Sequence, residues 1–450
     1  MAHTFSPRLT RRVLAAYGLP ALPLAAAYFP VYVFVAEFYA GTQGVPLATI
    51  GAIFLFVRIF DALSDPLAGL ASDRIRNRFG RRRPWIAVAV PIVAIATWNL
   101  FAPPAGAGAL WLCLWVFLLT FGWTIAMTPY FAWGAELSGN YRDRARIVIW
   151  REGLGLAGTI IAALIYGAAD VAADGMRAIA GFVILTLPVA VAICLWQVPE
   201  PRDFSRSAPS LHAIWRTLRF NRLFQRLLAA FFLNGMANGV ASALFIFFVA
   251  YRLDAPAMGG PLLVLYFSAA LLGAPVWSWA TGRMDKHRLW CWAMLYAGAV
   301  FVWMLVLGPG DWAFFAVICV FSGMALSADL SLPAAIQADV IDTATATDGA
   351  QQTGAFFALW SVVTKLALAG SSAGAFAYLG FFGFDIGSNG QRGHAALALL
   401  YGLAPIALKF AAVALMWNFP LNAAQVAQNR IRIETLSDRA ENTAERIERR

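Results

Sequence analysis

The sequence predicts an all-α membrane protein with about twelve transmembrane helices in two six-helix bundles. Three observations predict this class. Hydrophobic residues make up 60% of the chain and charged residues only 13%, whereas a soluble domain carries about 25% charged residues. Apolar stretches of the ~20 residues that a bilayer requires recur along the chain. A single long polar connection, residues 200–224, divides these stretches into two sets.

The expected spans follow the apolar stretches in chain order. Windows of about 19 residues place them at 13–40, 47–72, 84–102, 109–137, 147–170, 175–199, 225–251, 260–282, 288–308, 311–341, 352–380 and 396–419. The resulting organisation is an N-terminal six-helix bundle at 1–199, a cytoplasmic central loop at 200–224, a C-terminal six-helix bundle at 225–419 and a cytoplasmic tail at 420–450. A short basic loop follows the second span of each set, which indicates two related halves.

The net charge of +10 reports orientation in the membrane. Most of the 34 Lys and Arg residues lie in the termini and the even-numbered loops, and only Arg177, Arg252 and Arg392 lie in odd-numbered loops or at the span ends beside them. Basic loops stay on the cytoplasmic side, so both termini are expected there. The first apolar run continues to about Ala40, which is long enough to span and too long for a cleaved signal peptide. No nucleic-acid partner is expected.

Span one carries features of a helix that lines a cavity. Pro20, Pro23 and Pro30 permit bends, and such bends are tolerated where the backbone faces a cavity. Tyr28 and Tyr32 lie one turn apart on one face. These rings either stack on a solute or pack on a neighbouring helix, and both interpretations stay open.

Span two carries Arg58, Asp61 and Asp65 within an otherwise apolar stretch. Residues at these spacings share one helical face. Each ionisable group inside a span costs roughly 2.5–3.5 kcal/mol on insertion scales, and such groups usually mark ion pathways or substrate sites. Two carboxylates in a low dielectric require a proton or a cation between them. The pair therefore predicts a site for H⁺ or Na⁺, and the alternative is that Arg58 or Lys365 neutralises the acids and fastens the helices together.

Five further residues lie inside expected spans. Lys365 in span eleven needs a counter-charge, and the acids of span two are the obvious partners; the alternative is a side chain that extends to the interface. Lys409, near the end of span twelve, is assigned to that interfacial role. Asn234 and Asn238 share a face of span seven, where amides either face a cavity or bind neighbouring helices. Trp360 lies near Lys365 and is expected to line the same cavity.

The segment after span two carries a recognisable motif. Gly69, Asp73-Arg74 and Gly80-Arg81-Arg82 resemble the loop signature of the major facilitator superfamily. The longer string from Arg58 to Trp85 resembles the glycoside–pentoside–hexuronide:cation symporters, the melibiose permease-like branch. Weaker matches occur at Thr124, Met127-Thr-Pro129-Tyr130, Glu136, Asn234, Asn238, Asp339, Asp342 and Lys365.

The resemblance implies the major facilitator fold and specific roles. Asp61 and Asp65 match the cation-binding aspartates of that family, and Thr124 matches a polar neighbour. Lys365 matches the span-eleven lysine near the cation site of that family, and on this basis we expect it to occupy the acids until the cation displaces it. Arg151 matches an arginine on the substrate side; the alternative is that it only orients the chain, as the neighbouring arginines do. The chain departs from the pattern at Met127 and Ala25, where melibiose-type relatives carry aspartates, which puts galactoside specificity and Na⁺ preference in doubt.

A second group of charges is expected to control opening at the cytoplasmic side. Basic loop residues orient the chain, and they are also expected to form a charge-bonded latch with acids at the ends of spans four and ten. The predicted gating residues are Arg58, Asp73, Arg74, Arg81, Arg82, Glu136, Asp339 and Asp342.

The predicted function is cation-coupled (H⁺ or Na⁺) symport of a small polar organic solute, a glycoside or sugar acid, by alternating access. The alternative is a cation-coupled lysolipid or amphiphile transporter of the same fold. The solute-binding candidates are Tyr28, Tyr32, Met127, Arg151, Asn234, Asn238 and Trp360. The expected partners are the solute, the cation and the lipid bilayer, and the expected location is a bacterial inner membrane.

Other classes of protein fit the sequence poorly. No nucleophile–base set typical of an enzyme occurs. The four cysteines, Cys113, Cys194, Cys291 and Cys319, are far apart and form no CxxC pair, so no structural metal site is expected. No cofactor and no metal ion are expected beyond Na⁺ at Asp61 and Asp65, and the sequence makes no prediction of oligomeric state.

Overall fold

The computed structural model describes residues 9–74, 80–137, 141–199, 219, 221–348, 353–384, 391–422, 424–426 and 428–429. Within these ranges the regular elements are helices, and eleven of them are long and apolar enough to cross a membrane. The helix α4 (Leu47–Arg74) is not among these eleven, although its length of 28 residues is enough to span; its apolar stretch is interrupted by Arg58, Asp61 and Asp65. The predicted all-α membrane fold is therefore confirmed.

The N-terminal half begins with a broken helix. Three short helices replace one continuous span: α1 (Arg11–Gly18), α2 (Ala21–Val33) and α3 (Val35–Thr42). Pro20 precedes α2 and Pro30 lies within it, and a proline supplies no N–H for the helical ladder. The half continues with α4, α5 (Arg83–Phe101), α6 (Ala109–Glu136), α7 (Tyr141–Gly167) and α8 (Ala172–Gln197).

The C-terminal half begins at α10 (Arg222–Phe247). This helix ends in a π-helical turn, η1 (Phe248–Arg252), and a short 3-10 turn, η2 (Pro256–Met258), precedes the next helix. The remaining elements are α11 (Gly259–Thr281), α12 (Lys286–Val302), η3 (Trp303–Leu305), α13 (Trp312–Asp348), α14 (Thr353–Phe381) and α15 (Gln391–Met416). Segments 200–224 and 420–450 lie mostly outside the described residues, so the domain boundaries stay predictions.

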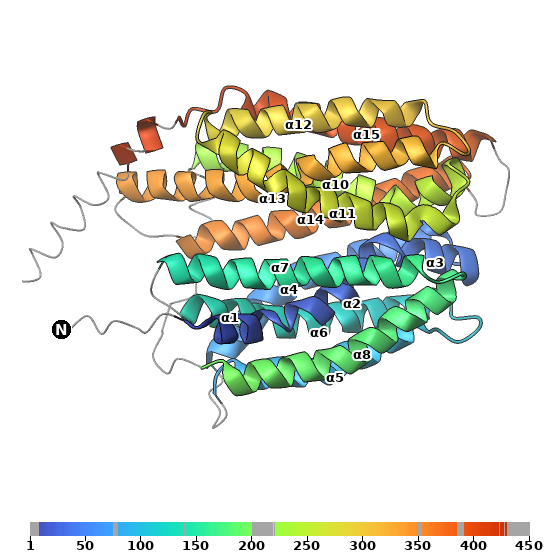
Figure 1. Ribbon diagram of the computed structural model, residues 1–450, viewed down its shortest axis with the longest axis horizontal. Coiled ribbons are helices and arrows are strands. Elements are labelled where there is room, and N and C mark those ends of the chain that lie inside the picture. The colour runs from blue at the N-terminus through green and yellow to red at the C-terminus, as the bar shows by residue number, and fades with distance from the viewer. Residues whose placement is uncertain are drawn as a thin grey trace, which may run out of the picture.

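The two halves lie side by side with their helices roughly parallel (Figure 1). The N-terminal half, blue to green, occupies the lower part of the view, and the C-terminal half, yellow-green to red, occupies the upper part. Several helix pairs join them: α4 packs on α14, α7 packs on α11, and α10 packs on α2 and α3. Side chains such as Leu110, Leu185, Trp196 and Phe381 are exposed on the outside of the bundle, as expected for a surface that meets lipid.

The halves touch closely at the end of the bundle opposite the basic loops. A Cβ on Gly167 of α7 would lie 2.8 Å from Pro261 Cδ of α11, so this crossing requires glycine. The Tyr251 hydroxyl of η1 donates a hydrogen bond of 3.1 Å to Glu37 Oε1 of α3. These contacts close the two halves together at this end.

Candidate cation and solute site

A charged cluster joins the two halves near the middle of the bundle. Lys365 on α14 lies 2.9 Å from Asp61 Oδ2 and 2.6 Å from Asp65 Oδ2, both on α4. Its ammonium also donates to the Asp61 carbonyl at 3.3 Å. Asp61 and Asp65 are four residues apart, so both carboxylates project from one face of α4 toward α14. The structure thus brings together the two acids and the lysine that the sequence singles out.

The two acids have different surroundings. Asp61 is only 1% exposed; its Oδ1 accepts a 2.6 Å hydrogen bond from the Thr124 hydroxyl on α6, and its Oδ2 lies 3.4 Å from Arg58 Nη1. The Asp65 side chain is 28% exposed. Asp61 is therefore the enclosed member of the pair, and Asp65 is the member that solvent reaches.

Arg58 is buried against aromatic rings. Its guanidinium carbon lies 4.5 Å from the centre of the Tyr32 ring and 5.2 Å from that of Tyr28. Such cation–π contacts stabilise a buried guanidinium. Tyr28 also stacks on Trp123, with ring centres 4.3 Å apart. In this structure Tyr28 and Tyr32 pack on protein groups, and Arg58 lies in the central cluster.

The cluster carries no net formal charge. Asp61 and Asp65 supply two negative charges, and Arg58 and Lys365 supply two positive charges within ion-pair distance. A neutral buried cluster avoids the large cost of an uncompensated charge. One incoming monovalent cation can replace Lys365 without changing that balance.

A second buried charge cluster lies within the C-terminal half. Lys409 on α15 lies 2.8 Å from Asp329 Oδ2 on α13 and donates to Asn234 Oδ1 at 2.7 Å. Asn238 and Trp290 each donate to Asp329 at 3.0 Å. The predicted interfacial role of Lys409 is wrong, because its side chain is only 6% exposed and fully engaged.

Asp329 is the residue that the sequence reasoning missed. It is the acid in the apolar stretch Ala328-Asp329-Leu330 of α13. One signal was available: an intramembrane lysine, Lys409, needs a counter-charge, and Asp329 is an acid within a span of the same half. Asn234 and Asn238 are therefore held by Lys409 and Asp329 within the C-terminal half.

The remaining solute candidates, Arg151, Trp360 and Met127, each contact a different set of neighbouring residues. Arg151 on α7 donates to Glu152 Oε1 at 2.6 and 3.1 Å, and its guanidinium lies 4.2 Å from the centre of the Phe131 ring. Trp360 on α14 stacks on Phe231 of α10 with ring centres 3.8 Å apart. Met127 packs, partly buried, against the main core. Within the described part of the chain, the contacts of these three side chains are with different neighbouring groups.

The predicted gating charges form pairs within each half. Glu136 accepts from Arg81 at 2.5 Å and from Arg82 at 2.8 Å. In the other half, Lys286 lies 2.6 Å from Asp339 Oδ2, and Asp342 follows on the same end of α13. The side chains of Asp73 and Arg74 lie outside the described part of the chain.

The described residues contain no group of three His, Cys, Asp or Glu side chains that is able to hold a metal ion. The oxygen set available to a monovalent cation is that of Asp61, Asp65 and Thr124. Because these groups come from α4 and α6, the site lies in the N-terminal half, and Lys365 reaches it from the other half.

Comparisons with known proteins agree with this architecture. A family model described as MFS/sugar transport protein matches residues 16–423. The chain is 24% identical over 382 residues to the putative glycoside/cation symporter YagG of Escherichia coli, covering 82% of each chain. It is 24% identical over 436 residues to the sodium-dependent lysophosphatidylcholine symporter 1 of Homo sapiens, covering 86% of this chain and 79% of that one.

Solved structures share the fold. The nucleoside transporter NupG aligns with a TM-score of 0.69 at 12% identity, over 90% of this chain and 98% of that chain. A bacterial homologue of the lysosomal transporter Spinster, in an inward-facing unoccupied conformation, aligns with a TM-score of 0.60 at 16% identity, over 96% and 98% of the two chains.

The membrane-spanning helices of the two halves share the fold of these solved transporters, and the match to a transport-protein family over residues 16–423 shows that the chain is a membrane transporter and not an enzyme. The chain belongs to the MFS/sugar transport protein family.

Proposed function

We propose that this protein is a cation-coupled symporter that moves a small polar organic solute, a glycoside or sugar acid, by alternating access. The observation that carries the proposal is the position of Lys365, an ammonium from one half held by Asp61 and Asp65 of the other half. Relatives named as a glycoside/cation symporter and a glucuronide carrier homologue support the symport class.

The proposed coupling is a competition for the two carboxylates. In the empty state Lys365 occupies them and ties α14 to α4. H⁺ or Na⁺ enters at Asp65, the more exposed acid, and displaces the ammonium. Asp61 keeps its contacts with Thr124 and Arg58. The cation shifts the equilibrium between states because it binds the lysine-free arrangement, and a ligand shifts an equilibrium only through such a difference in affinity.

The charge balance of the cluster supports a stoichiometry of one monovalent cation per cycle. Two acids face Arg58 and Lys365, and Arg58 stays in place through its contacts with Tyr28 and Tyr32. Only the charge of Lys365 is therefore replaced. A second cation would leave the site with a net positive charge in a low-dielectric environment, which is costly.

The solute path and the orientation complete the proposal. The solute path passes the central charge cluster. On that side it is lined by Tyr28, Tyr32, Met127, Arg151 and Trp360, and in the C-terminal half it is lined by Asn234 and Asn238. Both termini lie in the cytoplasm of a bacterial cell, in accord with the basic loops. The paired charges Arg81, Arg82 and Glu136, with Asp339 and Lys286, then lie at the cytoplasmic side and stabilise it in one of the two states.

A lysolipid or amphiphile is the second candidate solute. The observation that favours it is the similarity to the sodium-dependent lysophosphatidylcholine symporter over 86% of this chain. Met127 and Ala25 also make the N-terminal half less polar than two aspartates would. Competition between glycosides and lysolipids for the purified protein separates the two candidates.

The test is uptake into proteoliposomes under imposed pH and Na⁺ gradients. Wild-type protein accumulates the solute against its gradient only when one cation gradient is present. Asp65→Asn is expected to lose this accumulation. Asp174→Asn is the matched control, because Asp174 is an exposed acid on α8, paired only loosely with Arg177 at 3.5 Å. Uphill uptake by Asp65→Asn at the wild-type rate would contradict the proposal.

A further inference from the structure

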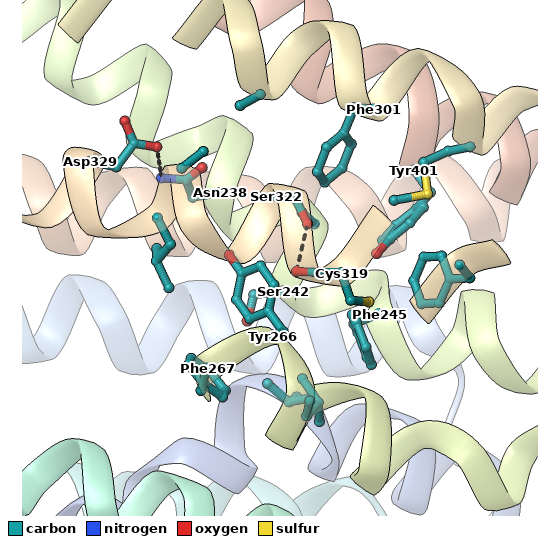
Figure 2. Close-up of a pocket in the computed structure, with 18 of the residues that line it drawn as sticks. Asn238, Ser242, Phe245, Tyr266, Phe267, Phe301, Cys319, Ser322, Asp329 and Tyr401 are labelled. Carbon is teal, nitrogen blue, oxygen red and sulfur yellow. Dashed lines mark hydrogen bonds between the residues drawn. The ribbon is translucent and has the colours of Figure 1, made fainter. Parts of the chain in front are cut away.

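A cavity lies inside the C-terminal half, apart from the Asp61–Asp65 site (Figure 2). Its walls come from α10, α11, α12, α13 and α15, and Phe29 and Val33 of α2 close it on the side of the other half. Asp61, Asp65 and Lys365 do not line it. It is therefore a separate space.

The cavity has a polar end and an aromatic end. Asp329 and Asn238 lie at one side in Figure 2, and Phe301, Phe245 and Tyr401 lie at the other. Lys409 and Ser242 add to the polar end. The aromatic walls are formed by Phe245, Phe267, Phe301, Phe315, Tyr266 and Tyr401. A ligand that fits both ends is amphipathic.

The polar end offers hydrogen bonds without net charge. Asp329 and Lys409 neutralise each other at 2.8 Å, and Asn238 donates to Asp329 at 3.0 Å. A charged ligand group would gain no opposite charge here and would lose its hydration, which is costly. The ligand group at this end is therefore uncharged.

Two hydroxyl groups on the cavity wall are free to bind a ligand. Within the described part of the chain, neither Tyr266 nor Ser242 has a side-chain hydrogen-bond partner, and both line the cavity. A ligand hydroxyl or ether oxygen satisfies these groups. The polar groups gather at one end of the cavity. A whole sugar ring buried in the cavity would therefore leave several of its hydroxyls without hydrogen bonds, and each such hydroxyl would weaken binding.

We propose that this cavity binds the aromatic ring of an aryl glycoside, with the glycosidic end of that ring directed toward Ser242, Tyr266 and the Asp329–Lys409 pair. Aromatic walls favour an aromatic ring through edge and offset contacts. This inference rests on the proposed function and narrows its substrate class from glycosides in general to glycosides with an apolar ring.

Helix α2 connects the cavity to the cation site. Phe29 and Val33 face the cavity, whereas Tyr28 and Tyr32 on the same helix contact Arg58, which pairs with Asp61. A ring bound against Phe29 therefore contacts α2, the same helix whose Tyr28 and Tyr32 contact Arg58 of the cation cluster. Coupling between two sites is reciprocal, so the cation is expected to raise the affinity for the aryl glycoside.

The experiment measures binding to the purified full-length protein by intrinsic fluorescence and thermal stabilisation. The probes are the 4-nitrophenyl glycosides of glucose, galactose, xylose and glucuronic acid, each compared with its free sugar. At least one aryl glycoside is expected to bind roughly tenfold or more tightly than its free sugar, since an apolar ring gains free energy on burial.

Two variants locate the binding. Ala297→Phe fills the cavity from α12 and is expected to weaken aryl glycoside binding at least tenfold. Ala299→Phe is its matched control, since Ala299 is exposed on the same helix, and it is expected to bind as wild type does. Tyr266→Phe keeps the shape of the cavity and removes one hydroxyl, and a loss of roughly twofold to tenfold is expected from one hydrogen bond.

The outcomes separate this inference from the proposed function. Equal binding by wild type and Ala297→Phe, or no preference of wild type for any aryl glycoside, overturns the inference, and so does a preference for lysolipids that Ala297→Phe does not affect. None of these results alters gradient-driven uptake. Conversely, aryl glycoside binding that is lost in Ala297→Phe supports the cavity even if uptake by Asp65→Asn contradicts cation coupling.

Discussion

Lys365 Nζ lies 2.6 Å from Asp65 Oδ2, and this ion pair joins α14 of one half to α4 of the other. The same ammonium lies 2.9 Å from Asp61 Oδ2. Protonation of Asp65, or a cation bound to it, therefore weakens the ion pair that holds the two halves together.

Replacing Lys365 tests the competition directly. Lys365→Gln leaves two acids facing Arg58 alone, so the site carries one uncompensated negative charge. The cation is expected to bind roughly tenfold more tightly, the equivalent of about 1.4 kcal/mol, whereas uphill accumulation falls because the switch is lost. The measurement is the cation concentration at half-maximal stabilisation. Lys365→Arg, which keeps the charge, is the control, and an unchanged cation affinity in Lys365→Gln would count against displacement.

The stability of Lys365→Gln is expected to depend on pH with a definite sign. Protonation of one acid removes the uncompensated negative charge, so the folded state binds that proton more readily than the unfolded chain does. A group that gains protons on folding stabilises the protein as pH falls. The melting temperature of the variant should therefore rise toward acid pH relative to wild type, and a parallel pH profile for both proteins would contradict the charge count.

The Asp329–Lys409 ion pair is expected to be essential for the folding stability of the C-terminal bundle. Removing one partner of a buried pair leaves a charge without compensation and costs about 3–5 kcal/mol. Asp329→Asn alone should lower the melting temperature strongly, and the double variant Asp329→Asn with Lys409→Gln should recover much of the loss. A double variant no more stable than Asp329→Asn would show that the two residues do not act as a pair.

The Tyr251–Glu37 hydrogen bond is expected to hold the halves together at the end opposite the basic loops. Tyr251→Phe removes a bond of about 0.5–1.5 kcal/mol and should increase opening at that end roughly twofold to tenfold. The labelling rate of a cysteine at Ala373, which packs against Gly51 between the halves, reports the opening. Cys194, Cys291 and Cys319 are buried, and the partly buried Cys113 is replaced by serine to limit background labelling. An unaltered rate in Tyr251→Phe would exclude this role.

Much of the central site could be predicted from the sequence. Asp61 and Asp65 stand out because acids are rare inside apolar spans, and Lys365 follows from the need for a counter-charge. The broken first span follows from its prolines. All three predictions depend on local sequence or on charge balance. None of them requires knowledge of the distances between helices.

The rest depends on how the helices pack. Nothing in the local sequence of Lys409 distinguishes a side chain that reaches the interface from one that pairs with Asp329, because their helices α15 and α13 are far apart in the chain. The contact of Arg58 with Tyr32 likewise joins two helices. The sequence names Glu136 and Asp339 as latch acids, but it does not show which basic residue each one pairs with; the structure pairs Glu136 with Arg81 and Asp339 with Lys286.

The central claim is that Asp61 and Asp65 are alternately occupied by Lys365 and by a transported cation. Infrared difference spectroscopy of the carboxylate bands, recorded on addition of Na⁺, acid or solute, tests it most directly, with Asp65→Asn to assign the signal. The account predicts a band change in wild type that Asp65→Asn abolishes and that Lys365→Gln shifts to lower cation concentration. Carboxylate bands that stay constant under all three additions would contradict it.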